Sequence, residues 1–216
     1  MPPFPSEIIF GALLRYAVRG QSELSRRSRD VRTAVKTDGF IGQTRVIEHA
    51  ARRVAENLQE HGCLSQCLGP DVILVPMPRS GLMKAGALWP AQVIGEALCQ
   101  QGAGAVVLPC LRRVTPLRKA STAGPGERPD PADHYLTTAV DPSRLEQPRA
   151  VTIIDDIVTR GSSFVGVIPH LMAAFPGVPI RCFAMIRTIS QGDVATILDP
   201  VTGWITYIND QLRREP

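Results

Sequence analysis

The sequence has no long hydrophobic run and no recognisable export signal. No uninterrupted apolar stretch among its 216 residues approaches the roughly 18–20 residues of a membrane-spanning helix. The first residues, Met-Pro-Pro-Phe-Pro-Ser-Glu, lack the basic start and the apolar core of a signal peptide. We therefore expect a cytoplasmic protein that does not use a membrane as a partner.

The cysteines do not have the pattern of a disulfide framework. The five cysteines are an odd number without regular spacing, which favours reduced thiols in a cytosolic protein. Cys63 and Cys67, with His61 just before them, suggest half of a zinc site, but a second pair of ligands is missing nearby. Packing or loop roles explain these cysteines better.

The composition fits one globular α/β domain with an anionic partner. A chain of 216 residues, 44% of them hydrophobic, is long enough for a single domain with a sizeable core, which we prefer to two small domains. A formal net charge of +4 suits anionic substrates and nucleic acid equally well. Charge alone therefore does not choose between these partners.

The most informative stretch runs from residue 151 to residue 174. Val151–Ile154 is apolar and β-branched, which predicts a strand buried on both faces. Asp155 and Asp156 follow at its carboxyl end, and then comes the small, hydroxyl-rich turn Thr159–Ser163. The apolar stretch Phe164–Ala174 predicts a helix. This order of strand, turn and helix is half of the repeating unit of an open α/β fold. In such folds ligands bind at the carboxyl ends of the strands.

The residue types in this stretch predict a site for a phosphorylated sugar. A turn of small residues before a helix presents backbone N–H groups to a phosphate, and the hydroxyls of Thr159, Ser162 and Ser163 can add donors. Asp155 and Asp156 would repel a phosphate, so we expect them to accept hydrogen bonds from ribose hydroxyls or to hold Mg²⁺. Together these groups indicate a ribose 5-phosphate.

A second loop follows another predicted strand, Val72–Val75. Proline cannot donate to a sheet, so the strand ends in the following Pro-Met-Pro sequence. Next come Arg79, Ser80 and Gly81, which combine a charge, a hydroxyl and a flexible backbone in one tight loop. These are the groups that a second phosphate site needs.

Four apolar runs, at residues 72–75, 105–109, 151–155 and 180–186, predict a Rossmann-like open parallel sheet flanked by helices. We divide the chain into a helical N-terminal region (1–69), a core (70–188) and a C-terminal extension or hood (189–216), within one domain overall. The helices predicted from periodicity are Ser6–Val18, Thr44–Glu60 and Ala85–Gln100.

Two segments are strongly basic, and the second of them, Leu111–Leu136, is not expected to form regular structure. Residues 21–38 carry several basic residues without interleaved aromatics, so a solvated face or loop is a better interpretation than a nucleic-acid surface. Leu111–Leu136 combines arginine and lysine with proline and glycine. A loop of this length inside a compact domain is usually functional or disordered.

The stretch at 151–163 resembles the phosphoribosyl-pyrophosphate (PRPP) signature of type I phosphoribosyltransferases. Its order of strand, two acids, two apolar residues and Thr-Arg-Gly-Ser-Ser carries the likeness, which extends over about residues 70–188. Thr152 stands where an aliphatic residue is expected, and Arg160 stands where threonine is commonest. Within the family the closest likeness is to ComF-like proteins, although the four-cysteine zinc ribbon of many of these is missing.

The resemblance implies roles for individual residues. Thr159, Arg160, Gly161, Ser162 and Ser163 would hold the 5-phosphate. The loop of Arg79, Ser80 and Gly81 would bind pyrophosphate. Asp155 and Asp156 would serve catalysis by holding the ribose diol, directly or through Mg²⁺. A flexible loop would close over the site and bring cations to the pyrophosphate, with Arg113, Lys119 and Arg128 as candidates.

Two functions remain open at this point. The first is an enzyme that transfers a phosphoribosyl group from PRPP to a nitrogen base and releases pyrophosphate. The second is a regulatory module that senses PRPP or a nucleoside 5-monophosphate, with the basic N-terminal segment near nucleic acid. The basic residues between Arg112 and Arg128 favour the enzyme. The sequence identifies no acceptor base, and it leaves a homodimer open.

Overall fold

A computed structural model describes residues 2–118, 128–141, 148–190 and 192–216. The strands of its main sheet are β1 (Glu7–Ala17), β4 (Ile73–Pro76), β5 (Val106–Val107), β8 (Val151–Val158), β9 (Ile180–Ile189), β10 (Leu198–Ile208) and β11 (Gln211–Glu215). The sheet has seven strands in the order β11-β10-β1-β9-β8-β4-β5. All strands from β1 to β5 in this order are parallel, and β10 and β11 are antiparallel to their neighbours.

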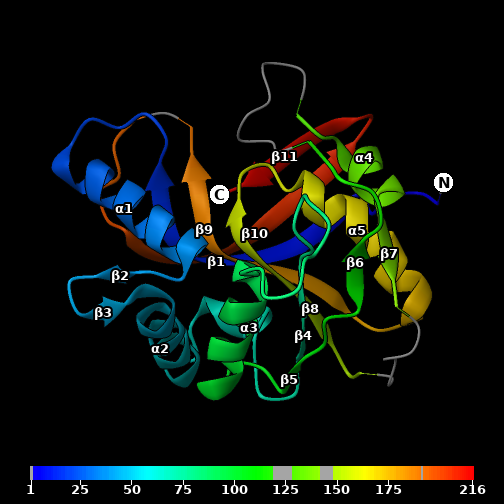
Figure 1. The fold of residues 1–216 in the computed structure, drawn as a ribbon, viewed down its shortest axis with the longest axis horizontal. Helices are drawn as coiled ribbons and strands as arrows, with labels where there is room; N and C mark the ends of the chain where they lie inside the picture. Colours follow the sequence, from blue (N-terminus) through cyan, green and yellow to red (C-terminus); the bar gives the residue numbers. More distant parts are fainter. Residues whose placement is uncertain (1, 119–127, 142–147, 191) are drawn as a thin grey trace.

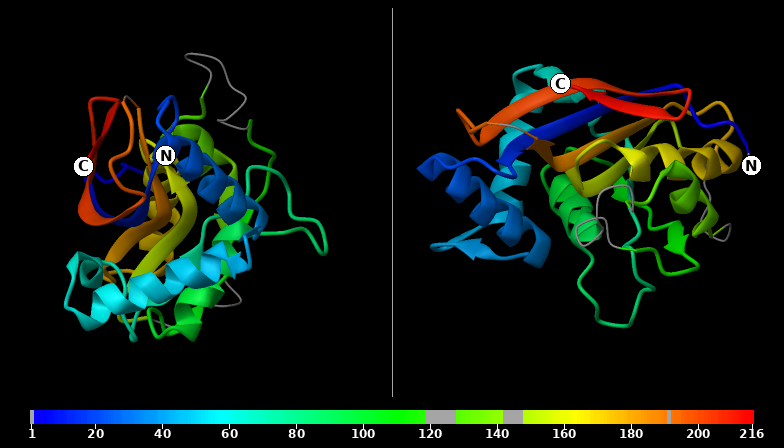
Figure 2. Two further views of the ribbon diagram at one scale, coloured as in Figure 1. Left: turned by 90° about the vertical axis from the view of Figure 1, so that its left-hand side faces the viewer. Right: turned by 90° about the horizontal axis from the view of Figure 1, so that it is seen from above.

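Helices cover both faces of the sheet, with two short hairpins beside them. The helices are α1 (Glu23–Thr37), α2 (Val46–Gln59), the 3-10 turn η1 (Cys63–Gln66), α3 (Pro90–Gln100), α4 (Pro131–Leu136) and α5 (Ser162–Ala174). The hairpins pair β2 (Phe40–Ile41) with β3 (Thr44–Arg45), and β6 (Leu111–Arg113) with β7 (Thr138–Val140). Helices α1 and α2 lie at one side of the molecule, and α4 and α5 at the other (Figures 1 and 2).

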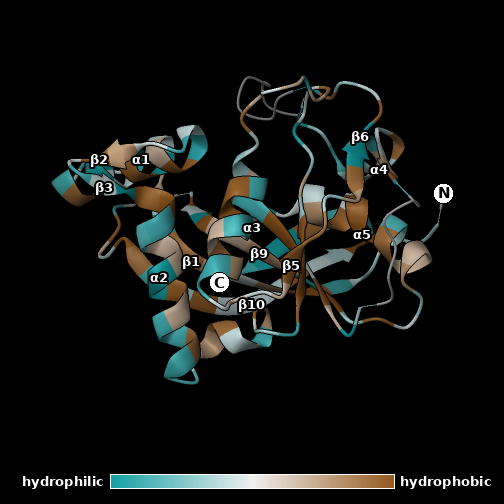
Figure 3. Cartoon of the chain, turned by 60° about the horizontal axis from the view of Figure 1, so that its bottom comes forward, coloured by the Kyte–Doolittle hydropathy of each residue, from teal (hydrophilic) through white to brown (hydrophobic). Residues whose placement is uncertain are grey.

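Two hydrophobic clusters hold these layers together. Ile47 of α2 and Leu98 of α3 belong to the first cluster, whereas Phe164 and Leu171 of α5 belong to the second. The helices α2 and α3 show hydrophilic and hydrophobic segments in alternation (Figure 3), as expected for helices with one face on a sheet. The protein is therefore an α/β structure with a mostly parallel sheet flanked by helices, which is compatible with the Rossmann-like fold that the sequence predicted.

The predicted core elements are present, with shifted ends. The strands at 72–75, 105–109, 151–155 and 180–186 correspond to β4, β5, β8 and β9. Strand β8 is longer than expected because it continues through the two acids to Val158. Thr152 lies within it, fully buried, and its hydroxyl donates to the backbone oxygen of Cys67. This bond explains how a hydroxyl is accommodated at a position where an aliphatic residue was expected.

The helix predicted at Ser6–Val18 is wrong, because this segment is strand β1. It lies between β9, to which it is parallel, and β10, to which it is antiparallel. Phe10 and Leu13 are buried in different clusters, so both faces of the strand are covered. A strand buried on both faces has a nearly continuous apolar sequence. Such a sequence also contains apolar residues at helical spacing, so periodicity alone does not distinguish it from a helix.

Residues 21–38, for which the sequence predicted a solvated face or loop, contain the helix α1. Its N-cap is Ser22, whose Oγ accepts a hydrogen bond from the N–H of Ser25 at 3.1 Å. The helix is fixed partly through hydroxyls, since Ser25 donates to Asp193 and Ser28 accepts from Ala17 N–H. A helix whose buried face includes serines has a weak apolar stripe, which is why periodicity did not reveal it.

One further prediction needs correction. Leu111–Leu136 is not irregular throughout, because it begins with β6 and ends with α4; residues 119–127 lie outside the described part of the chain. The segment expected as a C-terminal extension or hood adds β10 and β11 to the sheet. Hydrogen bonding to β1 satisfies the backbone of β10, which a separate cap would not do.

Candidate functional site

The candidate site lies at the point in the sheet from which successive strands are added in opposite directions. From β4 the chain passes through α3 to β5, on one side, and from β8 it passes through α5 to β9, on the other. Most buried residues of α3 belong to the first core cluster and those of α5 belong to the second, so the two helices cover opposite faces. Strands β4 and β8 are neighbours, and their carboxyl ends therefore border the crevice in which open α/β sheets bind ligands. We call this place the switch edge.

The acidic pair stands at the switch edge. The register pairs Pro76 with Ile154, and β8 then continues beyond its neighbour with Asp155 and Asp156. The N–H of Asp156 donates to Oδ1 of Asp155 at 2.8 Å. The hydroxyl of Ser163 lies 3.5 Å from the other oxygen of Asp155. The structure thus brings the carboxylate and the hydroxyl-rich turn together, as the sequence predicted.

The two carboxylates differ in their surroundings. Burial raises the pKa of Asp155 well above its ordinary value, and the neighbouring charge of Asp156 raises it further. Asp156 instead forms an ion pair with Lys36, whose Nζ is 3.0 Å from Oδ2. A raised pKa beside a second carboxylate is common at sites that bind or transform ligands.

The turn after β8 is built to expose backbone donors. Gly161 precedes α5 with φ of 97°, a left-handed conformation that favours glycine. Its own carbonyl accepts from the N–H of Val165 at 3.0 Å, which closes the first helical turn. Among the described residues, no side chain caps the helix. The N–H groups of Ser162 and Ser163 are therefore directed outward at the positive end of the helix dipole, where an anion is favoured.

The outer residues of this turn are free to meet a ligand. Thr159 and Arg160 are exposed, whereas Ser162 and Ser163 are half-buried. A hydroxyl and a guanidinium at the rim can add donors to a phosphate that the backbone already holds. All five residues that the sequence assigned to the 5-phosphate thus belong to one continuous turn.

The loop after β4 is more open. The guanidinium of Arg79 is turned to the backbone oxygen of Leu88, at 2.8 Å, and the N–H of Leu117 donates to Ser80 O at 2.7 Å. No described atom lies within 4 Å of the position that a Cβ would take on Gly81. The three residues assigned to pyrophosphate therefore share an exposed loop next to the switch edge, and in the described part of the chain they form no hydrogen bond to the acidic pair.

Arg113 has a different setting from the one expected of a loop residue. It lies in β6 with 6% of its surface exposed. Its guanidinium donates to the backbone oxygen of Arg79 at 3.0 Å and to the hydroxyls of Thr137 and Thr138 at 2.6 and 2.9 Å. Burial lowers its pKa, and the charge of Asp155 acts in the opposite direction. Arg113 thus connects the β6–β7 hairpin to the loop after β4.

The other loop cations are only partly placed. Arg128 is exposed just before α4. Lys119 lies outside the described residues, as do residues 120–127 of the loop that was expected to close over the site. The structure therefore places the strands and loops around the switch edge. Closure of the basic loop over the site stays a prediction.

Lys36 is the site residue that sequence reasoning missed. It belongs to the last turn of α1, and that helix was not predicted. Its ammonium group approaches the acidic pair from the side of α1, and Arg113 belongs to the hairpin on the other side of the site. The one available signal was its position at the end of a basic stretch, which by itself does not indicate a partner.

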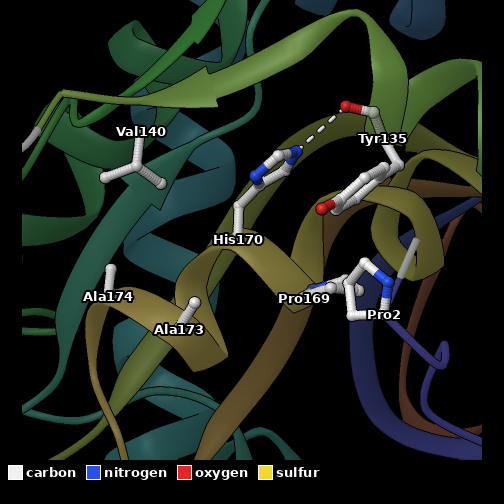
Figure 4. Close-up of a pocket in the computed structure, with 7 residues that line it drawn as sticks. All are labelled: Pro2, Tyr135, Val140, Pro169, His170, Ala173 and Ala174. Atoms are coloured by element: carbon white, nitrogen blue, oxygen red, sulfur yellow. Dashed lines mark hydrogen bonds between the residues drawn. The ribbon is translucent and has the colours of Figure 1, made fainter.

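A cavity elsewhere in the molecule does not belong to the switch edge. It has a volume of about 390 Å³ and is lined by Pro2, Tyr135, Val140, Pro169, His170, Ala173 and Ala174 (Figure 4). The rings of Tyr135 and His170 are stacked with centroids 4.3 Å apart, and the ring of His170 also contacts Tyr135 O at 3.0 Å. Apart from Pro2, these residues come from α4, β7 and the second half of α5, and the α5 residues are far along the helix from the phosphate turn.

Comparison with known proteins adds no assignment. The chain matches no protein-family profile and no curated protein sequence. No helix in the described part of the chain is both long and apolar enough to span a membrane. Among the described residues, no group of three or more His, Cys, Asp and Glu side chains is arranged to hold a metal. The function therefore has to be argued from the geometry of the switch edge.

Proposed function

We propose that the switch edge binds a ribose 5-phosphate group, within PRPP or a nucleoside 5-monophosphate. The observation that carries the proposal is the placement of an acidic pair and an uncapped helix start within one small site, with Ser163 Oγ 3.5 Å from Asp155 Oδ2. The turn favours a dianion, and the carboxylates favour neighbouring hydroxyls. A sugar with a diol and a 5-phosphate presents both kinds of group.

We further propose that the protein is a phosphoribosyltransferase of the type I fold. In this reaction the bond between ribose C1 and a pyrophosphate oxygen breaks, and its electron pair leaves with pyrophosphate. A nitrogen of the acceptor base then forms the new bond to C1. Asp155 and Asp156 hold the ribose, the turn Thr159–Ser163 holds its phosphate, and Arg79–Gly81 receives the pyrophosphate. Fixing both ends of the substrate orients C1 for attack.

Mg²⁺ fits this site as an ion shared with the substrate. Two carboxylates offer hard oxygen ligands, and Mg²⁺ commonly takes its remaining ligands from phosphates and water. Bound there, it would neutralise charge on the leaving pyrophosphate. Lys36 already pairs with Asp156, so binding of the metal by that carboxylate requires the ion pair to open.

A second candidate is a sensor that binds PRPP or a nucleotide without transferring it. The observation that favours it is the setting of Arg113, whose donors are engaged by Arg79 O, Thr137 and Thr138. A catalyst needs a cation at the leaving group, and Arg113 is not free to move there. If the protein is the enzyme, the cation at the leaving group comes from Arg79 or from a residue of the loop at 119–127.

Calorimetry and a pyrophosphate-release assay test these proposals together. Ribose 5-phosphate and PRPP should bind, PRPP with a dependence on Mg²⁺, and Asp155→Asn should weaken both. Release of pyrophosphate in the presence of one of a panel of bases supports the enzyme. Binding without release for any base supports the sensor. No binding of either ligand, with or without Mg²⁺, overturns both.

A further inference from the structure

The C-terminal hairpin of β10 and β11 reaches the phosphate turn. A Cβ on Gly161 would lie 2.6 Å from Cδ1 of Ile205, so β10 packs directly against the turn. Ile205 is paired across the hairpin with Arg214 of β11. The guanidinium of Arg214 donates to Thr188 O at 2.6 Å and lies 3.4 Å from Val158 O. Val158 is the last residue of β8, directly before the turn.

The atoms that Arg214 contacts explain its effect on this edge. Val158 and Thr188 lie near the carboxyl ends of two adjacent parallel strands. Carbonyl oxygens carry partial negative charge and would repel a phosphate. A guanidinium bonded to them offsets that charge and also fixes the point at which the chain enters the turn.

Arg214 is part of a cluster in which cations outnumber carboxylates. Arg187 is only 3% exposed and donates to Asp199, and Nε of Arg15 lies 3.3 Å from the same carboxylate. Among the described residues, Asp199 is the single carboxylate paired with these arginines. The buried Nε atoms of Arg187 and Arg214 have no hydrogen-bond partner within the described chain.

The excess charge persists at neutral pH. Burial, together with the charge of Arg187, lowers the pKa of Arg214 to about 10. This value is still well above neutrality, so the guanidinium of Arg214 is charged. Buried charge without a counter-ion is unfavourable, and a nearby anion relieves it.

We propose that Arg214 and Arg187 form a cationic support behind the phosphate turn, and that Arg214 is a positioning residue for the 5-phosphate of the ligand. The inference rests on the proposed function, since it assigns the phosphate to Thr159–Ser163. It adds that the C-terminal hairpin contributes to recognition and that the ligand must carry a doubly charged phosphate for full affinity. A purely structural role, in which Arg214 only holds the hairpin on the sheet, is the alternative.

The test compares two adjacent arginines of β11 by calorimetry with ribose 5-phosphate over a range of salt concentrations. Arg214→Gln keeps hydrogen-bond donors but removes the charge, and Arg214→Lys restores the charge. The control is Arg213→Gln, because Arg213 is exposed next to Arg214 in the same strand. We expect Arg214→Gln to weaken binding about tenfold and to flatten its salt dependence, since a fixed charge is screened by salt. Arg214→Lys should recover most of the affinity, and Arg213→Gln should resemble the wild type.

The outcomes separate the inference from the function on which it rests. Wild-type protein that does not bind ribose 5-phosphate overturns both. Wild-type binding with an Arg214→Gln variant that is unaffected, or weaker with an unchanged salt dependence, overturns the inference alone. If Arg214→Gln does not fold, Asp199→Asn decides the matter, since it removes the carboxylate of the cluster. Asp199→Asn should bind more tightly with a steeper salt dependence, and equal or weaker binding overturns the inference.

Discussion

Two segments leave neighbouring strands at the switch edge, and they differ in how firmly the protein holds them. The turn after β8 passes directly into α5, packs against Ile205 and is followed by the buried Phe164. The loop after β4 runs for more than ten residues before α3 begins and exposes Leu82 and Met83. The first is formed before a ligand arrives, whereas the second has few contacts to fix its shape.

The difference teaches how binding is divided between the two. A preformed turn loses little conformational entropy when it binds, so the 5-phosphate should supply much of the affinity. An exposed loop has to be ordered by its ligand, which lowers its contribution to binding. The loop after β4 therefore suits a group that is bound transiently, such as a leaving group.

The largest expected effect comes from placing a carboxylate in each segment. Ser163→Asp puts a negative charge at the start of α5 and should weaken ribose 5-phosphate binding by about a hundredfold or more, through repulsion of the phosphate. Ser80→Asp should leave ribose 5-phosphate binding nearly unchanged and weaken PRPP, because only PRPP carries pyrophosphate. Calorimetry with both ligands measures the contrast. Equal affinity of wild type and Ser163→Asp for ribose 5-phosphate would remove this turn from the site.

A matched pair of glycine substitutions compares the rigidity of the two segments. Gly161→Ala introduces a Cβ at a φ of 97° and 2.6 Å from Ile205, so we expect it to lower the free energy of unfolding by about 1–3 kcal/mol. Gly81→Ala meets no described atom within 4 Å and should be nearly neutral. Denaturant titrations give both values. A stability loss as large for Gly81→Ala as for Gly161→Ala would contradict the comparison.

The acid beside the turn should make stability depend on pH. Because the pKa of Asp155 is raised, the folded protein keeps a proton that the unfolded chain releases above about pH 4. Its contribution to stability therefore falls as the pH rises from that value through the raised pKa. Asp155→Asn removes this loss and should be more stable than the wild type at neutral pH.

The difference between Asp155→Asn and the wild type should disappear below about pH 4, where both states of the wild type are protonated. Urea titrations across the pH range measure it. Asp71→Asn, at an exposed position, is the control and should follow the wild-type profile. A variant at Asp155 that is less stable than the wild type at neutral pH would mean that the carboxylate is stabilised by contacts rather than penalised by burial.

The smallest expected effect concerns the arginine of the phosphate turn. Arg160 is exposed, so the backbone of the turn does most of the binding. Arg160→Thr should keep ribose 5-phosphate affinity within a few-fold, an effect of about 1 kcal/mol or less. Calorimetry at moderate salt is sufficient to measure it. A loss of a hundredfold or more would show that the guanidinium is a direct phosphate ligand.

The sequence predicted the strand, acids, turn and helix between Val151 and Ala174 because these elements are consecutive. Neighbours in the chain are held close by short connections, so residue type and order fix their local geometry. The approach of Ser163 to Asp155 follows from this local order. The remaining strands of the core were recognised for the same reason, each as an apolar run between breaks.

The tertiary structure alone decided what approaches this segment from elsewhere in the chain. Lys36 reaches Asp156 across 120 positions, and Arg214 reaches Val158 across 56. Both depend on elements that local patterns did not show: a helix docked partly through serines and a hairpin added to the edge of the sheet. Strand β1 was misread because burial on both faces erases the alternation that marks a strand. Contacts between distant segments depend on how the layers pack, and local patterns in the sequence do not show that packing.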